Sequence, residues 1–246
     1  MTAASAGARA VRVTVLTHRG AVRDANEDAL VAGPFTACGV SFADPVTHEL
    51  PLSAPVVVAV ADGMGGHAAG EVASAHAVRA LAAASPRDAT EIEAVLARID
   101  AELLAMGRAD PAVAGMGTTV AGVLLTADGS THFGVGDSRV YLESGGYLAQ
   151  VSTDDRGPLG GLSRCLGGRT DGTALPATAE PLAGADRLLL CSDGVSDLVD
   201  HETLEGLLGA PGGPARAVKS LWAAAMNASG RDNITVALVD FRPGGS

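Results

Sequence analysis

Apolar residues recur along the chain with two spacings, one typical of strands and the other of helices. Apolar and polar residues alternate over 11–16 (VRVTVL), which predicts a strand with one buried face. The mostly apolar segments 56–61 (VVVAVA) and 187–192 (RLLLCS) predict strands that are buried on both faces. A last strand is predicted over 233–241 (NITVALVDF).

Helical spacing follows the second of these strands. The segment 70–85 predicts a helix that packs through Val72, Ala75, Val78 and Leu81. A second helix is predicted over 91–106, where Thr90 and Glu93 form a capping-box signature. Because the two helices follow one another between strands, we expect them to form an antiparallel pair on one face of a sheet.

The remaining segments complete the prediction of the fold class. Residues 117–152 contain strands and turns at regular spacing and predict a meander, and two more helices are predicted over 201–208 and 214–229. Residues 153–184 are rich in Gly, Pro and Thr without periodicity, which favours a functional or mobile loop. Strand clusters beside helix pairs indicate a layered α+β fold, and without repeats or linkers we expect a single domain over 1–246.

Composition narrows the class of protein. The 246 residues include 17 Lys+Arg and 28 Asp+Glu, a formal net charge of −11, which argues against binding to nucleic acid or anionic membrane. The three cysteines are scattered without a CxxC motif, which argues against a disulfide framework or a thiolate zinc site. The N-terminus lacks an apolar signal core, and no apolar segment approaches the roughly 20 residues that span a bilayer. We therefore expect a soluble cytoplasmic protein.

Four carboxylates stand beside strands of buried type. Asp62, Asp137 and Asp193 follow apolar segments, and Asp232 precedes the last strand. Asp62 and Asp193 are each followed by Gly, and Asp-Gly is a common turn signal, so a turn explains any one of them well. Four such carboxylates in apolar settings instead favour a bound cation. Oxygen ligands without a His or Cys set indicate Mg²⁺ or Mn²⁺.

Six motifs carry a resemblance to a known family. They are RDANED at 23–28, ADGMGGHAAGEVAS at 61–74, GMGTT at 115–119, GDSRVY at 136–141, CSDGVSDLV at 191–199 and GRDNITV at 230–236. In this order they resemble the metal-dependent protein serine/threonine phosphatases (the PPM or type 2C family) in their bacterial form, over about residues 12–241. The resemblance implies a central β-sandwich of two antiparallel sheets flanked by antiparallel helix pairs (four layers, αββα), with two metals in a cleft at one end.

The resemblance also implies roles for individual residues. Asp62 would bridge both metals, the Gly63 carbonyl would bind one of them, and Asp193 and Asp232 would complete the other. The residues implied around the metal-bound waters are Glu27, Asp28 and Asn233. Arg23 would hold the substrate phosphate, since its planar fork fits two oxygens, and Asp137 would help to bind a third, weaker metal.

Some neighbouring residues invite other interpretations. The glycine-rich DGMGG segment lacks the GK[ST] end of a P-loop, which argues against a phosphate-cradling loop of that kind. His67 lies beside the expected site, but some relatives carry His two residues after the bridging Asp, where this chain has Met64. We therefore interpret His67 as structural or as part of the outer shell, with water supplying the leaving-group proton.

Residues outside the expected metal set receive structural interpretations. Ser138 and Ser192 lack the elbow motif and partner His of a serine nucleophile. Arg139 is expected to pair with a carboxylate, and Trp222 to lie in the core.

The chain departs from the family pattern in two segments. Only residues 156–168 stand where bacterial members carry a longer flap, which predicts an altered substrate choice and an altered third-metal site at Asp137. Residues 32–55 form a longer connection than expected, which we interpret as a surface loop near the site that contacts substrate.

The sequence therefore predicts a Mn²⁺- or Mg²⁺-dependent phosphatase of phosphoserine and phosphothreonine, acting by direct attack of a metal-bridging water or hydroxide. We expect it to act as a monomer on proteins phosphorylated by Ser/Thr kinases. Two alternatives remain: a metal-dependent phosphatase of small phosphorylated molecules, and a non-catalytic relative that binds phosphopeptides for regulation.

Overall fold

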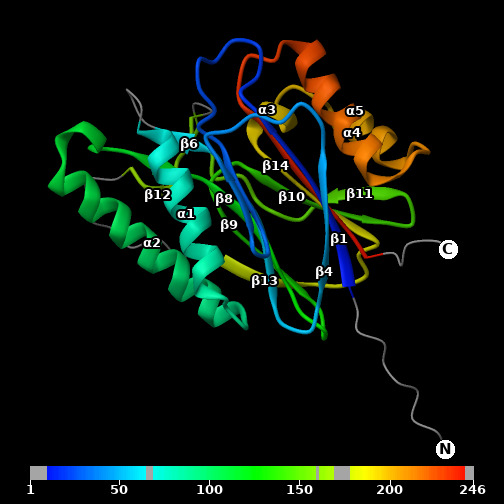
Figure 1. The fold of residues 1–246 in the computed structure, drawn as a ribbon, viewed down its shortest axis with the longest axis horizontal. Helices are drawn as coiled ribbons and strands as arrows, with labels where there is room; N and C mark the ends of the chain where they lie inside the picture. The colour runs from blue at the N-terminus through cyan, green and yellow to red at the C-terminus, as the bar shows by residue number, and fades with distance from the viewer. Residues whose placement is uncertain (1–9, 65–68, 159–160, 169–177, 242–246) are drawn as a thin grey trace, which may run out of the picture.

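Two six-stranded antiparallel sheets lie face to face in the computed structural model, with helices on both outer faces (Figure 1). The structure describes residues 10–64, 69–158, 161–168 and 178–241. The arrangement confirms the predicted α+β class and the sandwich that the family resemblance implied. None of the helices in these described ranges combines the length and the apolar character needed to cross a bilayer.

The first sheet is built around the two ends of the described chain. Its strands, in spatial order, are β11 (Tyr147–Gln150), β10 (Arg139–Ser144), β14 (Arg187–Cys191), β15 (Ile234–Asp240), β1 (Ala10–His18) and β4 (Val46–Pro51). His18 at the end of β1 lies opposite Ile234 at the start of β15, and Cys191 at the end of β14 lies opposite Val236. The segments that leave these three strands therefore meet at one end of the sheet.

The second sheet brings further strand ends to the same place. Its strands are β13 (Thr178–Leu182), β9 (Ser130–Val135), β8 (Val120–Leu125), β5 (Val56–Ala61), β2 (Ala29–Ala32) and β3 (Phe35–Cys38). Ala29 at the start of β2 pairs with Ala61 at the end of β5, and Val120 at the start of β8 pairs with Val135 at the end of β9. A small sheet of β12 (Leu166–Gly167), β7 (Gly117–Thr118) and β6 (Gly63–Met64) continues from this end.

Three apolar clusters hold the layers together. One lies between the two sheets and includes Val13, Val58 and Val123. A second joins the outer face of the second sheet to α1 (Gly70–Ala84) and α2 (Ala89–Ala109), and a third joins the first sheet to α4 (His201–Gly209) and α5 (Gly213–Ala228). Strands such as β5 are therefore buried on both faces, as their unbroken apolar sequence predicted. Two short helices, a 3₁₀ turn at Pro111–Val113 and α3 at Asp193–Ser196, complete the described elements.

Two predictions about local structure are wrong in detail. The second helix begins at Ala89, because Asp88 is its N-cap and accepts a hydrogen bond from the Glu91 amide, so the Thr90–Glu93 pair is not the cap. Trp222 is only half-buried on α5; it packs edge-on against His18 with ring centroids 5.5 Å apart, and Lys219 lies over its ring.

Three segments are organised differently from their predictions. The strands of 117–152 form two hairpins in different sheets, because the chain crosses from one sheet to the other at 136–138, where Gly136 has a φ of +109°. The expected surface loop 32–55 contains β3 and β4, which are edge strands. The expected loop 153–184 contains β12 and β13, although 169–177 lie outside the described residues.

We expect Arg187→Met to lower the free energy of unfolding by about 3–5 kcal/mol, because it would leave the carboxylate of Glu143 buried without its ion pair. Arg187 and Glu143 are 6% and 5% exposed, and Arg187 Nη1 also donates to the Leu208 carbonyl at 2.9 Å, which ties α4 to the sheet. Urea denaturation measures the loss. The matched control is Arg87→Met, which removes an exposed ion pair with Glu91 and should lower the free energy of unfolding far less than Arg187→Met does. Equal losses in the two variants would contradict the prediction.

Candidate metal centre

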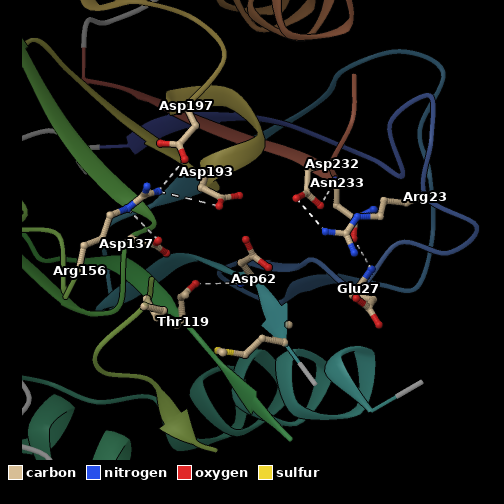
Figure 2. A pocket seen from close by; sticks show the side chains of 13 residues that line it. Arg23, Glu27, Asp62, Thr119, Asp137, Arg156, Asp193, Asp197, Asp232 and Asn233 are labelled. Atoms are coloured by element: carbon tan, nitrogen blue, oxygen red, sulfur yellow. Dashed lines mark hydrogen bonds and ion pairs between the residues drawn. The ribbon is translucent and has the colours of Figure 1, made fainter. Parts of the chain in front are cut away.

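The strand ends described above surround a cleft of about 440 Å³. Its lining includes the residues labelled in Figure 2: Arg23, Glu27, Asp62, Thr119, Asp137, Arg156, Asp193, Asp197, Asp232 and Asn233. Asp62 lies between two groups in this view. We call the group with Arg23, Asp232 and Asn233 the Arg23 side, and the group with Asp137, Arg156, Asp193 and Asp197 the Asp137 side.

Asp62 follows β5 directly, and two threonines hold its backbone. The Asp62 amide donates to Thr119 Oγ1 at 3.0 Å, and the Asp62 carbonyl accepts from the Thr118 hydroxyl and the Thr119 amide, each at 2.9 Å. The Thr119 hydroxyl also bonds to the Ser138 hydroxyl at 2.7 Å. The carboxylate is therefore carried on a backbone with little freedom and points into the cleft (Figure 2).

Close packing requires the glycines that follow Asp62 and Asp193. Neither Gly63 nor Gly194 has a positive φ, so neither forms the glycine turn that Asp-Gly commonly signals. A Cβ atom on Gly63 would lie 2.2 Å from the Gly70 carbonyl oxygen, and one on Gly194 would lie 1.9 Å from the Asn233 carbonyl oxygen. Each glycine lets a neighbouring chain segment approach beside an acidic residue of the cleft.

On the Arg23 side, Asn233 ties the loop after β1 to the start of β15. Its Nδ2 donates to the carbonyls of Arg19 and Ala25 at 3.0 and 2.9 Å, and its Oδ1 accepts from the Glu27 amide at 2.8 Å. This loop presents Arg23, whose Nη2 donates to Asp232 Oδ2 at 2.9 Å. The bond to Asp232 raises the pKa of Arg23, which stays protonated.

Behind the cleft, Asp28 is buried with one oxygen satisfied. The Ser192 hydroxyl donates to Asp28 Oδ2 at 2.8 Å, and the Thr235 amide donates to Ser192 Oγ at 3.1 Å. Asp28 Oδ1 is buried and has no hydrogen-bond partner within the described part of the chain. Ser192 therefore has a structural role, and Ser138, bonded to Thr119, has one too.

On the Asp137 side, carboxylates gather around Arg156. Arg156 Nε lies 3.0 Å from Asp137 Oδ2, and its Nη2 donates to Asp197 Oδ2 at 2.8 Å and lies 4.0 Å from Asp193 Oδ2. Burial raises the pKa of Asp137, although Arg156 opposes the shift.

Arg139 pairs with Asp154 through Nη2 at 2.7 Å, as the sequence predicted for this arginine.

The carboxylates of the cleft destabilise one another's charged forms. Burial raises the pKa of Asp62 well above its ordinary value, and the charges of Asp28, Asp193 and Asp232 raise it further. Burial likewise raises the pKa of Asp28 to about 7, and it is the main cause of the raised pKa values of Asp193 and Glu27. The protein thus holds several negative charges together at a cost that a bound cation would offset.

The donor set fits a hard divalent cation. The groups available are carboxylate and carbonyl oxygens, which Mg²⁺ and Mn²⁺ prefer, and Asp28 has an unpartnered buried oxygen behind them. As the side chains stand, no group of three or more His, Cys, Asp or Glu within the described residues could hold an ion. In this arrangement Asp232 bonds to Arg23 and Asp137 pairs with Arg156, so either carboxylate must leave its arginine before it can bind an ion.

The structure brings together most of the residues that the sequence singled out. Those that line the cleft are Arg23, Glu27, Asp62, Gly63, Asp137, Asp193, Asp232 and Asn233; Asp28 lies behind it, and His67 lies outside the described residues. Sequence reasoning assigned no role to Thr119, Arg156 or Asp197, which also line the cleft. Thr119 and Asp197 stand within recognised motifs, but the position of Arg156 depends on contacts that have no signal in the sequence.

Comparisons with known proteins identify the family of the chain and relatives of the same fold. The family model for protein phosphatase 2C matches residues 44–241. Serine/threonine protein phosphatase PstP of Mycobacterium tuberculosis is 33% identical over 94% of this chain and 45% of PstP, so the chain spans about half the length of that relative. Serine/threonine phosphatase Stp of Listeria monocytogenes is 31% identical over 91% of this chain and 93% of Stp. A crystal structure of the catalytic domain of PstP in complex with two manganese ions matches with a TM-score of 0.76 and 32% identity, covering 94% of this chain and 98% of that chain.

Proposed function

Because the chain belongs to the protein phosphatase 2C family, we propose that it is a metal-dependent protein serine/threonine phosphatase. The observation that carries the proposal is the position of Asp62 between the Arg23 side and the Asp137 side of one cleft, with its pKa raised by burial and by three neighbouring carboxylates. A phosphopeptide-binding module without catalysis would not need so many mutually repelling carboxylates at one point.

We propose that Asp62, the Gly63 carbonyl, Asp193 and Asp232 hold two divalent cations, Mn²⁺ or Mg²⁺. When bound, these ions would lower the pKa of water in the cleft and neutralise charge on the phosphoryl oxygens. The residues proposed to order water beside the ions are Glu27, Asp28 and Asn233; the buried Asp28 is fixed by Ser192, and Asn233 by three backbone bonds.

The proposed role of Arg23 is to receive the substrate phosphate. Its side chain is 48% exposed, it stays charged, and it lies on a loop that Asn233 fixes. Turning from Asp232 toward a phosphate would release Asp232 for an ion and bring two parallel N–H donors to the phosphoryl oxygens. Arg23 would thus pair with Asp232 before substrate binds and with the phosphate once substrate is bound.

The partners that we propose are proteins carrying phosphoserine or phosphothreonine, met by a monomer in the cytoplasm. The relatives are named as protein phosphatases, and Cys38 and Cys191 form no disulfide within the described residues, as a reducing compartment favours.

The test is a set of hydrolysis assays on the full chain with p-nitrophenyl phosphate and with a phosphothreonine peptide. We expect turnover of both substrates with Mn²⁺, none with chelator, and a loss on the order of 10²-fold or more in Asp193→Ala. The control is Asp128→Asn, an exposed carboxylate in the turn between β8 and β9, which should behave as the wild type. Absence of metal-dependent turnover would refute the enzyme proposal. Turnover of the small ester alone would favour a phosphatase of small molecules.

A further inference from the structure

Arg156 places a positive charge among the carboxylates of the Asp137 side (Figure 2). It contacts Asp137 at 3.0 Å and Asp197 at 2.8 Å, and it lies 4.0 Å from Asp193 and 3.9 Å from Asp154. The Nε atom is buried, and its N–H makes no hydrogen bond within the described residues, so its contact with Asp137 is an ion pair without hydrogen-bond alignment. One guanidinium thus offsets the negative charge of several acidic groups that would otherwise repel one another.

The backbone on both sides of Arg156 is fixed. Arg156 forms a β-bridge with Leu162, and the Gly157 amide donates to the Gly161 carbonyl at 2.7 Å. The preceding residue, Asp155, donates its amide to the Gly136 carbonyl and accepts the Gly136 amide on Oδ2, each at 2.9 Å. The segment that carries Arg156 is therefore tied to the crossing that presents Asp137, so the two side chains are brought to the same place.

We infer that Arg156 is a built-in cation that takes the place of a third divalent ion between Asp137 and Asp197. A guanidinium at 2.8–3.0 Å from these two carboxylates occupies the space in which an ion would contact them, and it repels a further cation there. Arg156 is thus a positioning residue that keeps ions away from Asp137 and Asp197 and leaves Asp62, Asp193 and Asp232 to hold the two proposed ions. The inference rests on the proposed function only for the ions at Asp62, since the pairing of Arg156 is independent of them.

The segment 156–168, which the sequence resemblance predicted to be shorter than the flap of bacterial members, would give this arrangement a physical reason. Arg156 lies within the connection between β11 and β12, and from there it reaches the carboxylates of two other segments, 136–138 and 193–197. The third cation that the sequence resemblance implied at Asp137 is replaced, in this inference, by a side chain of the protein.

The experiment measures Mn²⁺ bound per chain at saturation by equilibrium dialysis, with free Mn²⁺ followed by electron paramagnetic resonance. We expect Arg156→Gln to bind about one Mn²⁺ ion more than the wild type, because it frees the carboxylates of Asp137 and Asp197 for a hard cation. Adding Asp137→Asn to Arg156→Gln should abolish the gain. The charge-matched control is Arg164→Gln, on the same segment and in contact with Asp155, which should leave the number of bound ions unchanged.

A second measurement does not depend on the folding of the Arg156 variant. In the wild-type background, Asp137→Asn should leave the number of bound Mn²⁺ ions unchanged, since Asp137 is occupied by Arg156. Loss of one ion in that variant, or an unchanged number in a folded Arg156→Gln variant, would overturn the inference. A wild type that binds no Mn²⁺ at all would instead count against the proposed function, and a gain in Arg156→Gln would still support the role of Arg156.

Discussion

Asp62→Asn is expected to lower kcat/KM toward a phosphothreonine peptide by on the order of 10³-fold or more, because the substitution removes the charge that both proposed ions share. Asparagine has the same shape, and the Thr119 and Thr118 bonds to the backbone of residue 62 do not involve its side chain. The variant should therefore keep its fold while losing metal-dependent turnover. Steady-state kinetics at saturating Mn²⁺ measure the loss.

The same substitution should make the metal-free protein more stable. The raised pKa of Asp62 means that the folded state binds its proton more tightly than the unfolded chain does. Ionisation of Asp62 therefore destabilises the fold, and the penalty grows as the pH rises from the ordinary value of 3.8 toward the raised pKa. Asparagine has no such penalty, so we expect a Tm in chelator about 2–4 °C above that of the wild type at neutral pH, for a gain of about 1 kcal/mol.

The difference in Tm should shrink as the pH is lowered toward the ordinary range of a carboxyl group, where Asp62 is protonated in both states. Thermal unfolding in chelator across this range gives the measurement, and Asp128→Asn is again the control, since that carboxylate is exposed. An Asp62→Asn variant that is inactive and also less stable without metal would mean that the fold needs the carboxylate, contrary to our interpretation.

Strong local patterns were sufficient to predict the central elements of the fold. The segment 56–61 could be assigned to a doubly buried strand because β-branched residues without polar interruption fit a strand covered on both faces. Asp62 could be placed at its end for the same reason, since a carboxylate cannot continue such a strand. These inferences use only neighbours in the sequence.

Elements that depend on distant neighbours were missed or assigned wrongly. The edge strand β4 (46–51) has weak alternation, with Val46, His48 and Leu50 less exposed than Thr47 and Glu49. Its conformation as a strand is fixed by its antiparallel pairing with β1. The hairpins of 117–152 looked like one meander because turn spacing does not reveal that a strand changes sheets. Only the packing of the two sheets determines that crossing.

The same distinction applies to the site. The motifs identified its carboxylates, because their types and order resemble a known family, but they gave no sign of what pairs with each one in the folded chain. The Arg23–Asp232 bond joins residues 209 positions apart, and Arg156 reaches Asp197 across 41 positions. Such pairings follow from the tertiary structure. They determine which carboxylates are held by an arginine and must leave it before they can bind an ion.

The Arg23–Asp232 pair leads to the second large effect. Arg23→Ala is expected to lower kcat/KM toward a phosphothreonine peptide by on the order of 10²-fold, since hydrogen bonds to charged groups contribute about 1.5–3 kcal/mol. Arg23→Lys should recover part of the loss, because it restores the charge without the planar fork. The matched control is Arg231→Ala, which removes an exposed guanidinium beside Asp232 and should change kcat/KM less than about threefold.

Mn²⁺ affinity separates the proposed role of Arg23 from a purely structural one. Without Arg23, Asp232 Oδ2 loses the guanidinium that lies 2.9 Å away and becomes free to bind a cation. Arg23→Ala should therefore bind Mn²⁺ at least as tightly as the wild type while losing activity, as a titration followed by electron paramagnetic resonance would measure. If Mn²⁺ affinity falls together with kcat/KM, Arg23 acts by holding Asp232 in place, and the assignment of Arg23 to the substrate phosphate is wrong.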